Sequence, residues 1–574
     1  MDRKKKGTDW VRISLIGIGL IALGWFTIRL LRPMLSPLLY PSPHKIRTQD
    51  ILPPSGRSIL KPFIRGVQHL PADVEKREQV REAFQWSWTA YERHAWGADE
   101  FHPLSQTGSN LTRAGGIGFT IVDSLDSLLV MGFEEEYKRA AKWVQEDLSF
   151  DKNSEFNTFE TTIRILGGLL SAHYLTSIHS NPTIQSDAPM YLERAVDLAD
   201  RLLGAFSTSS GIPLSSINLA TRQGIPDRAN NGWASLAEAA SLQLELKYLS
   251  HLTGDHVYWK KAEKVTEVIR AASMHDGIAP IFISPATGQF VASEIRLGSR
   301  GDSYYEYLIK QYLQTDRQEP VYRDMYDEAM SGIKTHLMGT TPYGMVVHTQ
   351  ELMPQRDPDT GGPAWKIVPK QDHLVCFLGG SFLLGVTEGG RRELNEETLV
   401  MPRDLEDVAV GTGIIEGCMK THETATGLAP EIAMFVEKSD PRAKEIDWYI
   451  KPNQNGILID GRNILRPETV ESLFLAYRLT GEEKYREYGW SIFQAFQRYC
   501  RVKKGGYAGV EDVQAMPPKQ LDKMETFWLG ETLKYLYLLF DDSDHIPLNR
   551  HVFNTEAHIF PVFQPEIMTP FATS

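Results

Sequence analysis

The sequence predicts an all-α fold in which helix hairpins close into a toroid whose long loops line a central cavity. Helical periodicity recurs from residue 76 almost to the C-terminus with few strand-like runs, and one local phrase appears three times, at residues 131–137, 252–258 and 479–485. Each phrase places a glycine between two apolar periodic segments, which is typical of a glycine-capped helix followed by a helix that begins with acidic residues. Because the interval between the phrases is not constant, a toroid is favoured over a short-period solenoid.

The composition is that of a globular protein and excludes some classes of function. The chain has 574 residues, enough for one large toroid or several ordinary domains, and 42% of them are hydrophobic and 23% charged. The formal net charge of −12 argues against a nucleic-acid partner, because no basic surface is available overall. Three cysteines allow at most one disulfide and leave one thiol over, so their number does not identify the compartment.

The N-terminus predicts a membrane anchor. Residues 1–12 form a tail with a basic cluster from Arg3 to Lys6, and residues 13–31 form an apolar run that, with its flanks, is long enough to span a bilayer. The basic cluster should stay in the cytosol, which makes the chain a single-pass type II membrane protein with the remainder in the lumen. A cleaved signal peptide and an internal helix are the alternatives, although no small-x-small cleavage site follows the run. In the lumen, the sequon at Asn110 would be available for glycosylation.

Two further regions follow the anchor. Residues 32–75 contain recurrent prolines without a sustained apolar period, so we expect an extended stem. Residues 76–565 form the predicted helical domain, and the first helix of this domain presents one apolar face, made of Val80, Ala83, Phe84, Trp88 and Tyr91. Long loops rich in Gly, Pro, Asp and Asn, which are usually functional in a compact domain, lie at residues 207–231, 340–369 and 438–463.

Several carboxylates stand next to or inside apolar helical segments. Glu160 and Arg164 are four residues apart and share a helix face just before the apolar run 165–170. An exposed ion pair is the ordinary interpretation, but the apolar surroundings speak against it. Asp302 and Glu306 are also four residues apart and carry like charges, which repel unless a cation or a shared proton relieves them. The alternative, helix capping by Asp302, leaves Glu306 unexplained.

Three more segments carry acids in the same way. Glu468 and Glu471 fall in the first turn of a helix that begins near Pro467, Glu525 precedes an apolar helix, and Glu556 lies in the segment 554–558. Acids are common in a first helical turn, so each signal alone is weak. Together the five segments supply enough carboxyl groups for a sugar-cleaving site, in which one acid protonates the leaving oxygen and another activates water. The remaining acids would bind sugar hydroxyls or surround a hard cation.

These residues and their neighbours resemble a known family. The matching segments occur in one order at residues 122–128, 159–170, 236–238, 300–307, 373–377, 428–431, 465–472, 522–527 and 553–558. From about Val80 to Phe560 the chain resembles the class I α-mannosidases, glycoside hydrolase family 47. The resemblance implies an (αα)7 barrel, bound Ca²⁺, and an inverting exo-α-1,2-mannosidase that trims oligomannose N-glycans, with residues 76–565 as its catalytic domain.

The resemblance also implies roles for individual residues. Glu160 matches the general acid, acting through a water, Glu468 matches the base, and Asp302 matches a third catalytic acid, although these three roles have been assigned differently within the family. Thr555 matches the Ca²⁺ ligand, with Glu556 acting through water. The positions that match substrate-binding or site-lining residues are Arg164, Glu238, Arg300, Glu306, His373, Glu431, Arg466, Glu471 and Glu525. Cys376 and Cys418 match a disulfide pair, which would leave Cys500 free.

Arg300 resembles the endoplasmic-reticulum branch of the family, because Golgi-type relatives carry a small or aliphatic residue there. This resemblance implies a glycan of nine mannoses as the substrate and a location in the endoplasmic-reticulum or early Golgi membrane. Two other functions remain as alternatives. A lectin-like quality-control factor of the same fold would bind such glycans without turnover, but Glu160, Asp302 and Glu468 are all present. A prenyltransferase-like toroid would need a zinc site of Cys and His, which three scattered cysteines do not supply.

Overall fold

The protein is described by a computed structural model that covers residues 69–272, 274–394 and 401–571. The predicted cytosolic tail, the anchor at residues 13–31 and nearly all of the stem lie outside the described residues. Among the described residues, no helix has the length and apolar character required to cross a membrane.

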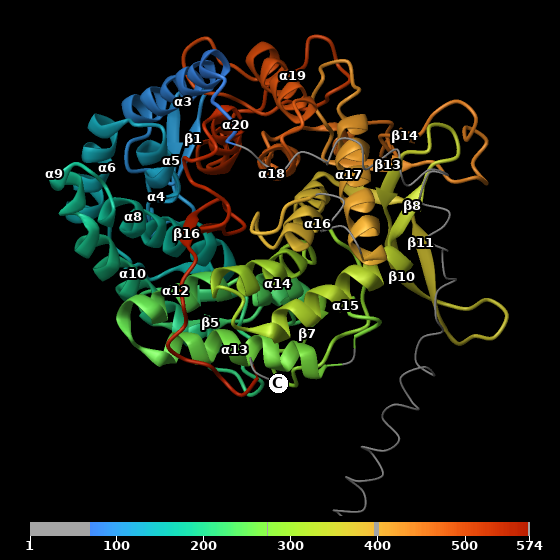
Figure 1. The fold of residues 1–574 in the computed structure, drawn as a ribbon, viewed down its shortest axis with the longest axis horizontal. Helices are drawn as coiled ribbons and strands as arrows, with labels where there is room; N and C mark the ends of the chain where they lie inside the picture. The colour runs from blue at the N-terminus through green and yellow to red at the C-terminus, as the bar shows by residue number, and fades with distance from the viewer. Residues whose placement is uncertain (1–68, 273, 395–400, 572–574) are drawn as a thin grey trace, which may run out of the picture.

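The described chain forms a closed ring of helix pairs, seen face-on in Figure 1. The inner helices, each packed on the next, are α5 (Leu125–Val130), α8 (Gly167–Ser177), α12 (Gln243–Thr253), α14 (Asp302–Gln314), α16 (Phe377–Thr387), α18 (Glu468–Thr480) and α20 (Leu533–Phe540). The ring closes because the turn that leads into α20 packs on α5. The outer helices are α3 (Val74–His94), α6 (Glu134–Glu146), α10 (Ala188–Leu202), α13 (His256–Ala271), α15 (Pro320–His336), α17 (Pro402–Thr421) and α19 (Lys484–Tyr499). The predicted (αα)7 barrel is therefore confirmed.

Burial separates the two layers of the barrel. Every residue of α16 is buried, as expected for a helix that is apolar on all sides and has neighbours all round. Glycines allow the closest approach: a Cβ at Gly379 would lie 2.6 Å from Ile415 of α17, and one at Gly380 would lie 2.7 Å from Leu475 of α18. Outer helix α3 buries a single face, and that face is the predicted one, made of Val80, Ala83, Phe84, Trp88 and Tyr91.

The three repeated phrases mark helix hairpins, as predicted. Gly132, Gly254 and Gly481 have φ values of 71°, 71° and 70°, the left-handed conformation that glycine adopts without steric cost. They follow α5, α12 and α18, and the next helix in each case is the outer helix α6, α13 or α19. Two of the outer helices differ from the expectation of an acidic first turn. Helix α13 begins at His256, with Asp255 as its N-cap, and α19 begins at Lys484, with Glu482 and Glu483 just before it.

Short elements fill the connections. The short helices are α4 (Phe119–Asp123), α7 (Thr158–Glu160), α9 (Pro182–Gln185), α11 (Leu236–Ala240), the 3-10 turns Leu203–Phe206, Arg228–Asn230, His373–Cys376 and Ile459–Gly461, and the π-helical turns Thr161–Leu166 and Trp528–Thr532. The three-stranded antiparallel sheets are β3 (Glu155–Asn157), β4 (Ser216–Asn218) and β5 (Gln223–Ile225), and β12 (Lys370–Asp372), β13 (Ile432–Phe435) and β14 (Trp448–Tyr449). The two-stranded ones are β1 (Glu100–His102) with β2 (Thr107–Ser109), β6 (Ala234–Ser235) with β7 (Phe282–Ile283), β8 (Met338–Thr340) with β9 (Val347–Thr349), β10 (Glu351–Arg356) with β11 (Pro363–Val368), and β15 (His551–Phe553) with β16 (Ile559–Pro561).

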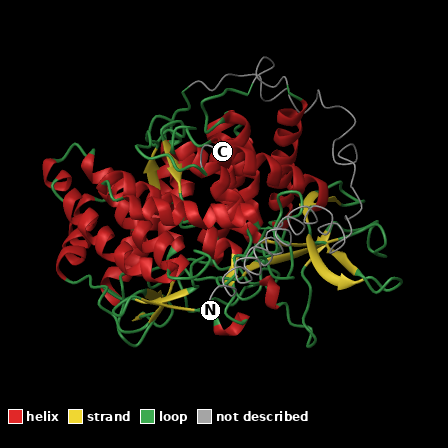
Figure 2. Ribbon diagram, turned by 90° about the horizontal axis from the view of Figure 1, so that it is seen from below, coloured by secondary structure: helices red, strands yellow, loops and turns green. Residues whose placement is uncertain are grey.

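Strands are thus present where the sequence predicts long loops, within residues 207–231, 340–369 and 438–463. Most of them lie along one side of the helical layer in Figure 2. They are too short for a two-residue alternation to stand out from a loop, which is why the helical pattern dominated the prediction.

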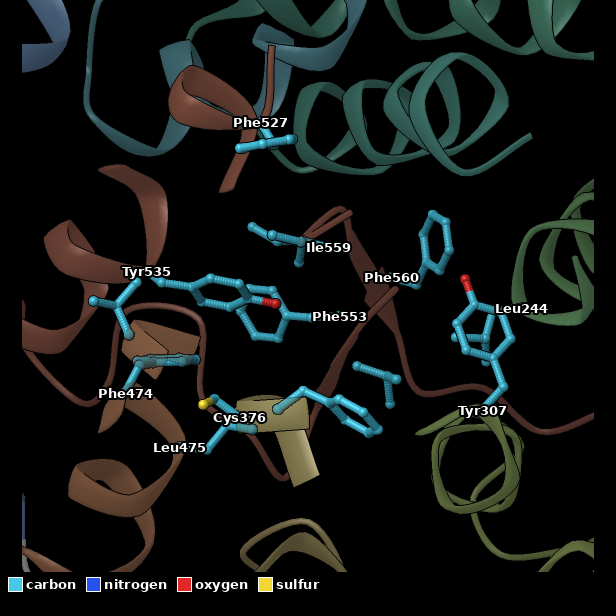
Figure 3. Close-up of a cluster of buried hydrophobic side chains, with 14 of the residues drawn as sticks. Leu244, Tyr307, Cys376, Phe474, Leu475, Phe527, Tyr535, Phe553, Ile559 and Phe560 are labelled. Carbon is cyan, nitrogen blue, oxygen red and sulfur yellow. The ribbon is translucent and has the colours of Figure 1, made fainter. Parts of the chain in front are cut away.

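The hairpin β15–β16 occupies the centre of the ring. Figure 3 shows Phe553, Ile559 and Phe560 of the hairpin among side chains from the inner helices, including Tyr307 and Phe474. The hairpin carries its tip, residues 554–558, to a central cavity. A disulfide between Cys376 and Cys418, with Cα atoms 6.0 Å apart, joins the start of α16 to α17, while Cys500 is a buried free thiol.

Candidate active site

A cavity of about 340 Å³ lies at the hairpin tip, and charged side chains dominate its lining. Eight carboxyl groups line it: Glu160, Glu238, Asp302, Glu306, Glu468, Glu471, Glu531 and Glu556. Three arginines face them: Arg164, Arg300 and Arg466. Apolar wall is supplied by Phe159, Phe377 and Phe527, among others. The carboxyl groups outnumber the arginines, so protons or a bound cation must relieve part of the negative charge.

The structure brings most of the sequence-predicted residues to this one cavity. All three matched catalytic acids line it, together with Thr555 and Glu556 of the hairpin tip. Three predicted residues stand outside the lining: His373, Glu431 and Glu525. The first two support residues that do line it, because His373 Nε2 is 3.7 Å from a carboxylate oxygen of Glu468 and Glu431 accepts hydrogen bonds from Arg466 at 2.8 and 2.9 Å.

Glu525 has a different environment. Its carboxylate pairs with Lys523 at 3.0 Å, and Lys523 also pairs with Glu100 on β1. Glu531, which the sequence analysis missed, does line the cavity and is fully enclosed. It lies in the π-helical turn Trp528–Thr532, and burial raises its pKa well above the ordinary value, with Glu468 adding to the effect. The signal that singled out Glu160, a carboxylate beside an apolar run, also applies to Glu531.

Glu160 is held by its neighbours at the start of the other π-helical turn, Thr161–Leu166. Asn157 caps α7 by accepting from the Glu160 amide at 2.8 Å, and its own amide group donates to Glu238 at 3.1 Å. Arg164 Nε donates to Glu160 at 2.8 Å. The side chain of Arg164 is 14% exposed and that of Glu160 is 40% exposed, and both line the cavity, so this is not an ordinary ion pair on an outer helix face. π-Helical turns are frequent at functional sites because they re-aim side chains.

Asp302 and Glu468 are largely buried carboxyl groups with elevated pKa values. Burial raises the pKa of Asp302 to about 7, and the nearby Glu306 and Glu468 add to the shift. Burial also raises the pKa of Glu468 to about 7, while Arg466 opposes it. Asp302 does not cap α14, because its carboxylate accepts only from the adjacent Ser303 amide, at 2.9 Å, among the described residues. Oε2 of Glu468 is buried and finds no hydrogen-bond partner in the described chain.

Three of the non-glycine residues with positive φ lie next to these site residues. Arg300, Leu465 and Ala557 have φ values of 75°, 71° and 59°, which L-residues rarely adopt. The first precedes Asp302 by two residues, the second precedes Arg466, and the third lies at the hairpin tip. Strained conformations persist where the surrounding structure fixes them, and they concentrate at functional sites.

The hairpin tip places oxygen atoms at the base of the cavity. Thr555 Oγ1 donates to Glu306 at 2.8 Å, and Glu306 also pairs with the buried Lys310, whose Nζ lies 3.4 Å from Glu471. Asn554 secures the tip, donating to Glu245 at 2.7 Å and accepting from the amides of Glu556 and His558 at 2.9 and 2.8 Å. The donor set around Thr555 therefore includes its hydroxyl and the Glu306 carboxylate, and oxygen ligands of this kind are those that a hard cation such as Ca²⁺ prefers.

Comparisons with known proteins agree with this geometry. The family model for glycosyl hydrolase family 47 matches residues 83–562. A mannosyl-oligosaccharide 1,2-alpha-mannosidase of Candida albicans is 46% identical over 501 residues, covering 85% of this chain and 83% of the relative. An endoplasmic reticulum enzyme of the same description from Schizosaccharomyces pombe is 43% identical over 504 residues, covering 86% and 91%.

A solved structure is similar over most of the chain as well. The alpha-1,2-mannosidase from Trichoderma reesei matches with a TM-score of 0.73 and 28% identity, over 86% of this chain and all of that one. The family model covers most of the chain, including the inner helices of the ring, the central hairpin and the residues that line the cavity. The protein belongs to glycosyl hydrolase family 47.

Proposed function

We propose that the protein is an inverting exo-α-1,2-mannosidase that removes mannose from oligomannose N-glycans. The observation that carries the proposal is the meeting of Glu160, Asp302 and Glu468, from three different segments, in one cavity. The names of the relatives support the substrate class. The central hairpin supports exo action, because Thr555 and Glu556 at its tip line the cavity, so a glycan end can enter the cavity but a chain cannot pass through the ring.

In the proposed reaction, the bond from the anomeric carbon to the glycosidic oxygen breaks and a bond from that carbon to a water oxygen forms. Glu160 supplies the proton to the leaving oxygen through a water, held in place by Arg164. Glu468 takes the proton of the attacking water on the opposite face, which inverts the configuration. Its elevated pKa and its unpartnered buried oxygen suit a proton acceptor. Asp302, which lines the same cavity, is the third catalytic acid in this proposal.

The remaining lining residues would bind the sugar. Phe527 offers an apolar ring face, with the guanidinium groups of Arg164 and Arg466 at 5.7 and 5.9 Å from its centroid. Arg300 lies against the ring of Phe282 at 5.2 Å, which holds the guanidinium at the wall of the cavity. Its match to the endoplasmic-reticulum branch supports a nine-mannose glycan as the preferred substrate.

We propose Ca²⁺ as the resident cation, and the residues at the hairpin tip fit it. Thr555 would hold the ion through its hydroxyl and carbonyl oxygens, and Glu306, Glu471 and Glu556 would order its waters. These carboxylates lie beside Lys310 and Arg164, so their excess charge is only partly neutralised by the protein itself. When bound, Ca²⁺ supplies a positive centre with flexible coordination that accepts sugar hydroxyls as ligands.

We also propose the organisation of the whole chain. Residues 1–12 would be a cytosolic tail, 13–31 a signal anchor, 32–75 a stem and 76–565 a lumenal catalytic domain in the endoplasmic reticulum or early Golgi. The names of relatives from Schizosaccharomyces pombe and Saccharomyces cerevisiae support the endoplasmic reticulum.

The test is digestion of a nine-mannose oligosaccharide by the full chain in detergent with Ca²⁺. Mass spectrometry should show stepwise loss of single mannoses, and proton NMR of the first product should show β-mannose, the inverted anomer. Glycan binding without release of mannose would favour the lectin-like alternative instead. Initial release of α-mannose would refute inversion while leaving hydrolysis intact.

A further inference from the structure

Outside the cavity, three side chains that commonly bind metals meet on the outer layer of the barrel. His275 and Asp276 lie in the turn after α13, and His336 lies in the last turn of α15. Their candidate ligand atoms all lie within 4.8 Å of one another. His336 Nε2 is 2.8 Å from Asp276 Oδ2, and the two imidazole rings have centroids 4.6 Å apart.

The backbone fixes this arrangement. His275 and Ile278 exchange two backbone hydrogen bonds of 2.9 Å, and Asp276 and Gly277 between them have φ values of 49° and 78°, which define a tight two-residue turn. The turn is pressed against α15: a Cβ at Gly332 would lie only 2.1 Å from the carbonyl oxygen of Asp276. The positions of the three side chains are therefore set by two rigid elements in close contact.

Two ring nitrogens at this place have no hydrogen-bond partner among the described residues. They are Nε2 of His275 and Nδ1 of His336, and both atoms are buried. Buried polar atoms in native proteins nearly always have a partner, so such an atom points to something that would pair with it.

We propose that His275, Asp276 and His336 form a binding site for a divalent transition-metal ion of the Zn²⁺ type. Two imidazoles and one carboxylate are a common ligand set for Zn²⁺, whereas Ca²⁺ prefers oxygen ligands throughout. In a tetrahedral zinc site neighbouring ligand atoms are about 3.3 Å apart. The ligand atoms here are at most 4.8 Å apart, so no pair must approach by more than about 1.5 Å. The side chain of Asp276 is 63% exposed, which gives the ion an entrance and leaves a position for water.

The role of this ion is structural. It joins the turn after α13 to the end of α15, two elements of neighbouring helix pairs. From the turn the chain continues into β7, which pairs with β6, and Ser235 of β6 lines the cavity. The ion would therefore stiffen the wall of the barrel behind the cavity without touching substrate, and it would be chemically distinct from the oxygen-bound cation at Thr555.

The experiment uses the full chain, saturated with Ca²⁺ and freed of transition metals, with Zn²⁺ and Co²⁺ as probes. Calorimetry should find one Zn²⁺ bound per chain with micromolar or tighter affinity and a raised Tm, and Co²⁺ should give the visible absorption of a site with nitrogen and oxygen ligands. His275→Ala and Asp276→Ala should each weaken Zn²⁺ binding at least tenfold. Both lie in a turn and not in a helix, so they test the site even where the buried His336→Ala fails to fold.

Matched controls separate this site from surface binding. His256→Ala, at an exposed histidine that begins α13, should bind Zn²⁺ like the parent protein. The exposed group of His69, Asp542 and Asp544 could also attract a metal, so His69→Ala is the second control. Zn²⁺ binding that is absent in the parent protein, is unchanged in His275→Ala, or is lost only in His69→Ala would overturn the proposal, the last case being an adventitious ion only.

Discussion

Arg164 and Glu556, 392 positions apart in the sequence, form an ion pair at the base of the cavity. The same guanidinium donates to Glu160 at 2.8 Å and lies 3.5 Å from the fully buried Asp123. One arginine of the barrel wall therefore connects the matched general acid to the hairpin that carries Thr555. Positive charge at this point compensates carboxylates that would otherwise be buried without a partner.

Replacement of Arg164 should therefore affect stability and activity together. Arg164→Met leaves the buried carboxylates of Glu556 and Asp123 without the positive charge of the guanidinium. Breaking a buried ion pair in this way lowers the free energy of unfolding by about 3–5 kcal/mol. Urea denaturation should show this loss in the free energy of unfolding. Lys264→Met, which removes an ion pair with Glu267 on α13 whose two side chains are about half exposed, is the control and should cost less than about 1 kcal/mol. Equal losses in the two variants would contradict the central role of Arg164.

Glu468→Gln and Glu160→Gln should each lower kcat by about 10²–10⁴-fold while glycan binding stays measurable. The amide keeps the shape of the side chain and removes its ability to exchange a proton. Steady-state kinetics and glycan-binding calorimetry on the same preparations distinguish loss of chemistry from loss of binding. Near-normal kcat in either variant would remove that residue from the proposed mechanism.

Glu531→Gln should be far more damaging to kcat/KM than Glu525→Gln. The first residue is enclosed in the cavity lining, whereas the second pairs with Lys523 outside it. We expect a loss of at least tenfold for Glu531→Gln and less than threefold for Glu525→Gln, each at saturating Ca²⁺. A larger loss at Glu525 would restore the role that the family resemblance implies for it.

Asp302 and Glu468 should make the metal-free protein less stable as the pH rises from about 4 to 7. The pKa values of Asp302 and Glu468 are both about 7 in the folded protein, above the value near 4 of an unfolded carboxyl group. A raised folded pKa gives stability that is complete below the unfolded pKa and is lost as the pH rises through the folded one. The pKa shifts of these two groups together change the free energy of unfolding by about a few kcal/mol.

Amide variants isolate this contribution from other titrating groups. His348 and His422 have pKa values lowered by burial to about 4, so they act in the opposite direction and weaken the fold as the pH falls below about 6.5. Urea denaturation at pH 5 and pH 7.5 should therefore show a smaller difference between the two pH values when Asp302→Asn and Glu468→Gln are combined than in the Ca²⁺-free parent. If the difference in the free energy of unfolding between the two pH values is unchanged in the double variant, the pKa values of these two carboxyl groups are not raised in the folded protein.

Chelation of Ca²⁺ should abolish turnover and weaken mannose binding together, because a site with few direct protein ligands uses the substrate to complete its coordination. Thr555→Ala should have the same effect while far-UV circular dichroism still reports a folded helical barrel. Mg²⁺ should restore activity poorly, since it requires tight octahedral geometry and gives up water reluctantly. Full turnover in excess chelator, with the protein shown to be free of metal, would exclude a catalytic role for Ca²⁺.

The sequence by itself determined the features that depend only on residues close together in the chain. Glycine caps at Gly132, Gly254 and Gly481 fix where helices end, because only glycine enters the left-handed conformation without steric cost. The apolar face of α3 follows from the helical period alone. The order of the matched segments identified the family, and with it the residues that gather in the cavity.

Only the tertiary structure decided which acids line the same cavity and how far their pKa values are shifted. Glu525 and Glu531 are six residues apart and look alike in the sequence, yet one pairs with Lys523 outside the cavity and the other is enclosed in its lining. The joining of Arg164 to Glu556 depends on closing the ring and inserting the hairpin, which no local pattern encodes. The elevated pKa values of Asp302 and Glu468 have the same origin, because desolvation depends on everything that surrounds a carboxyl group and not on its neighbours in the chain.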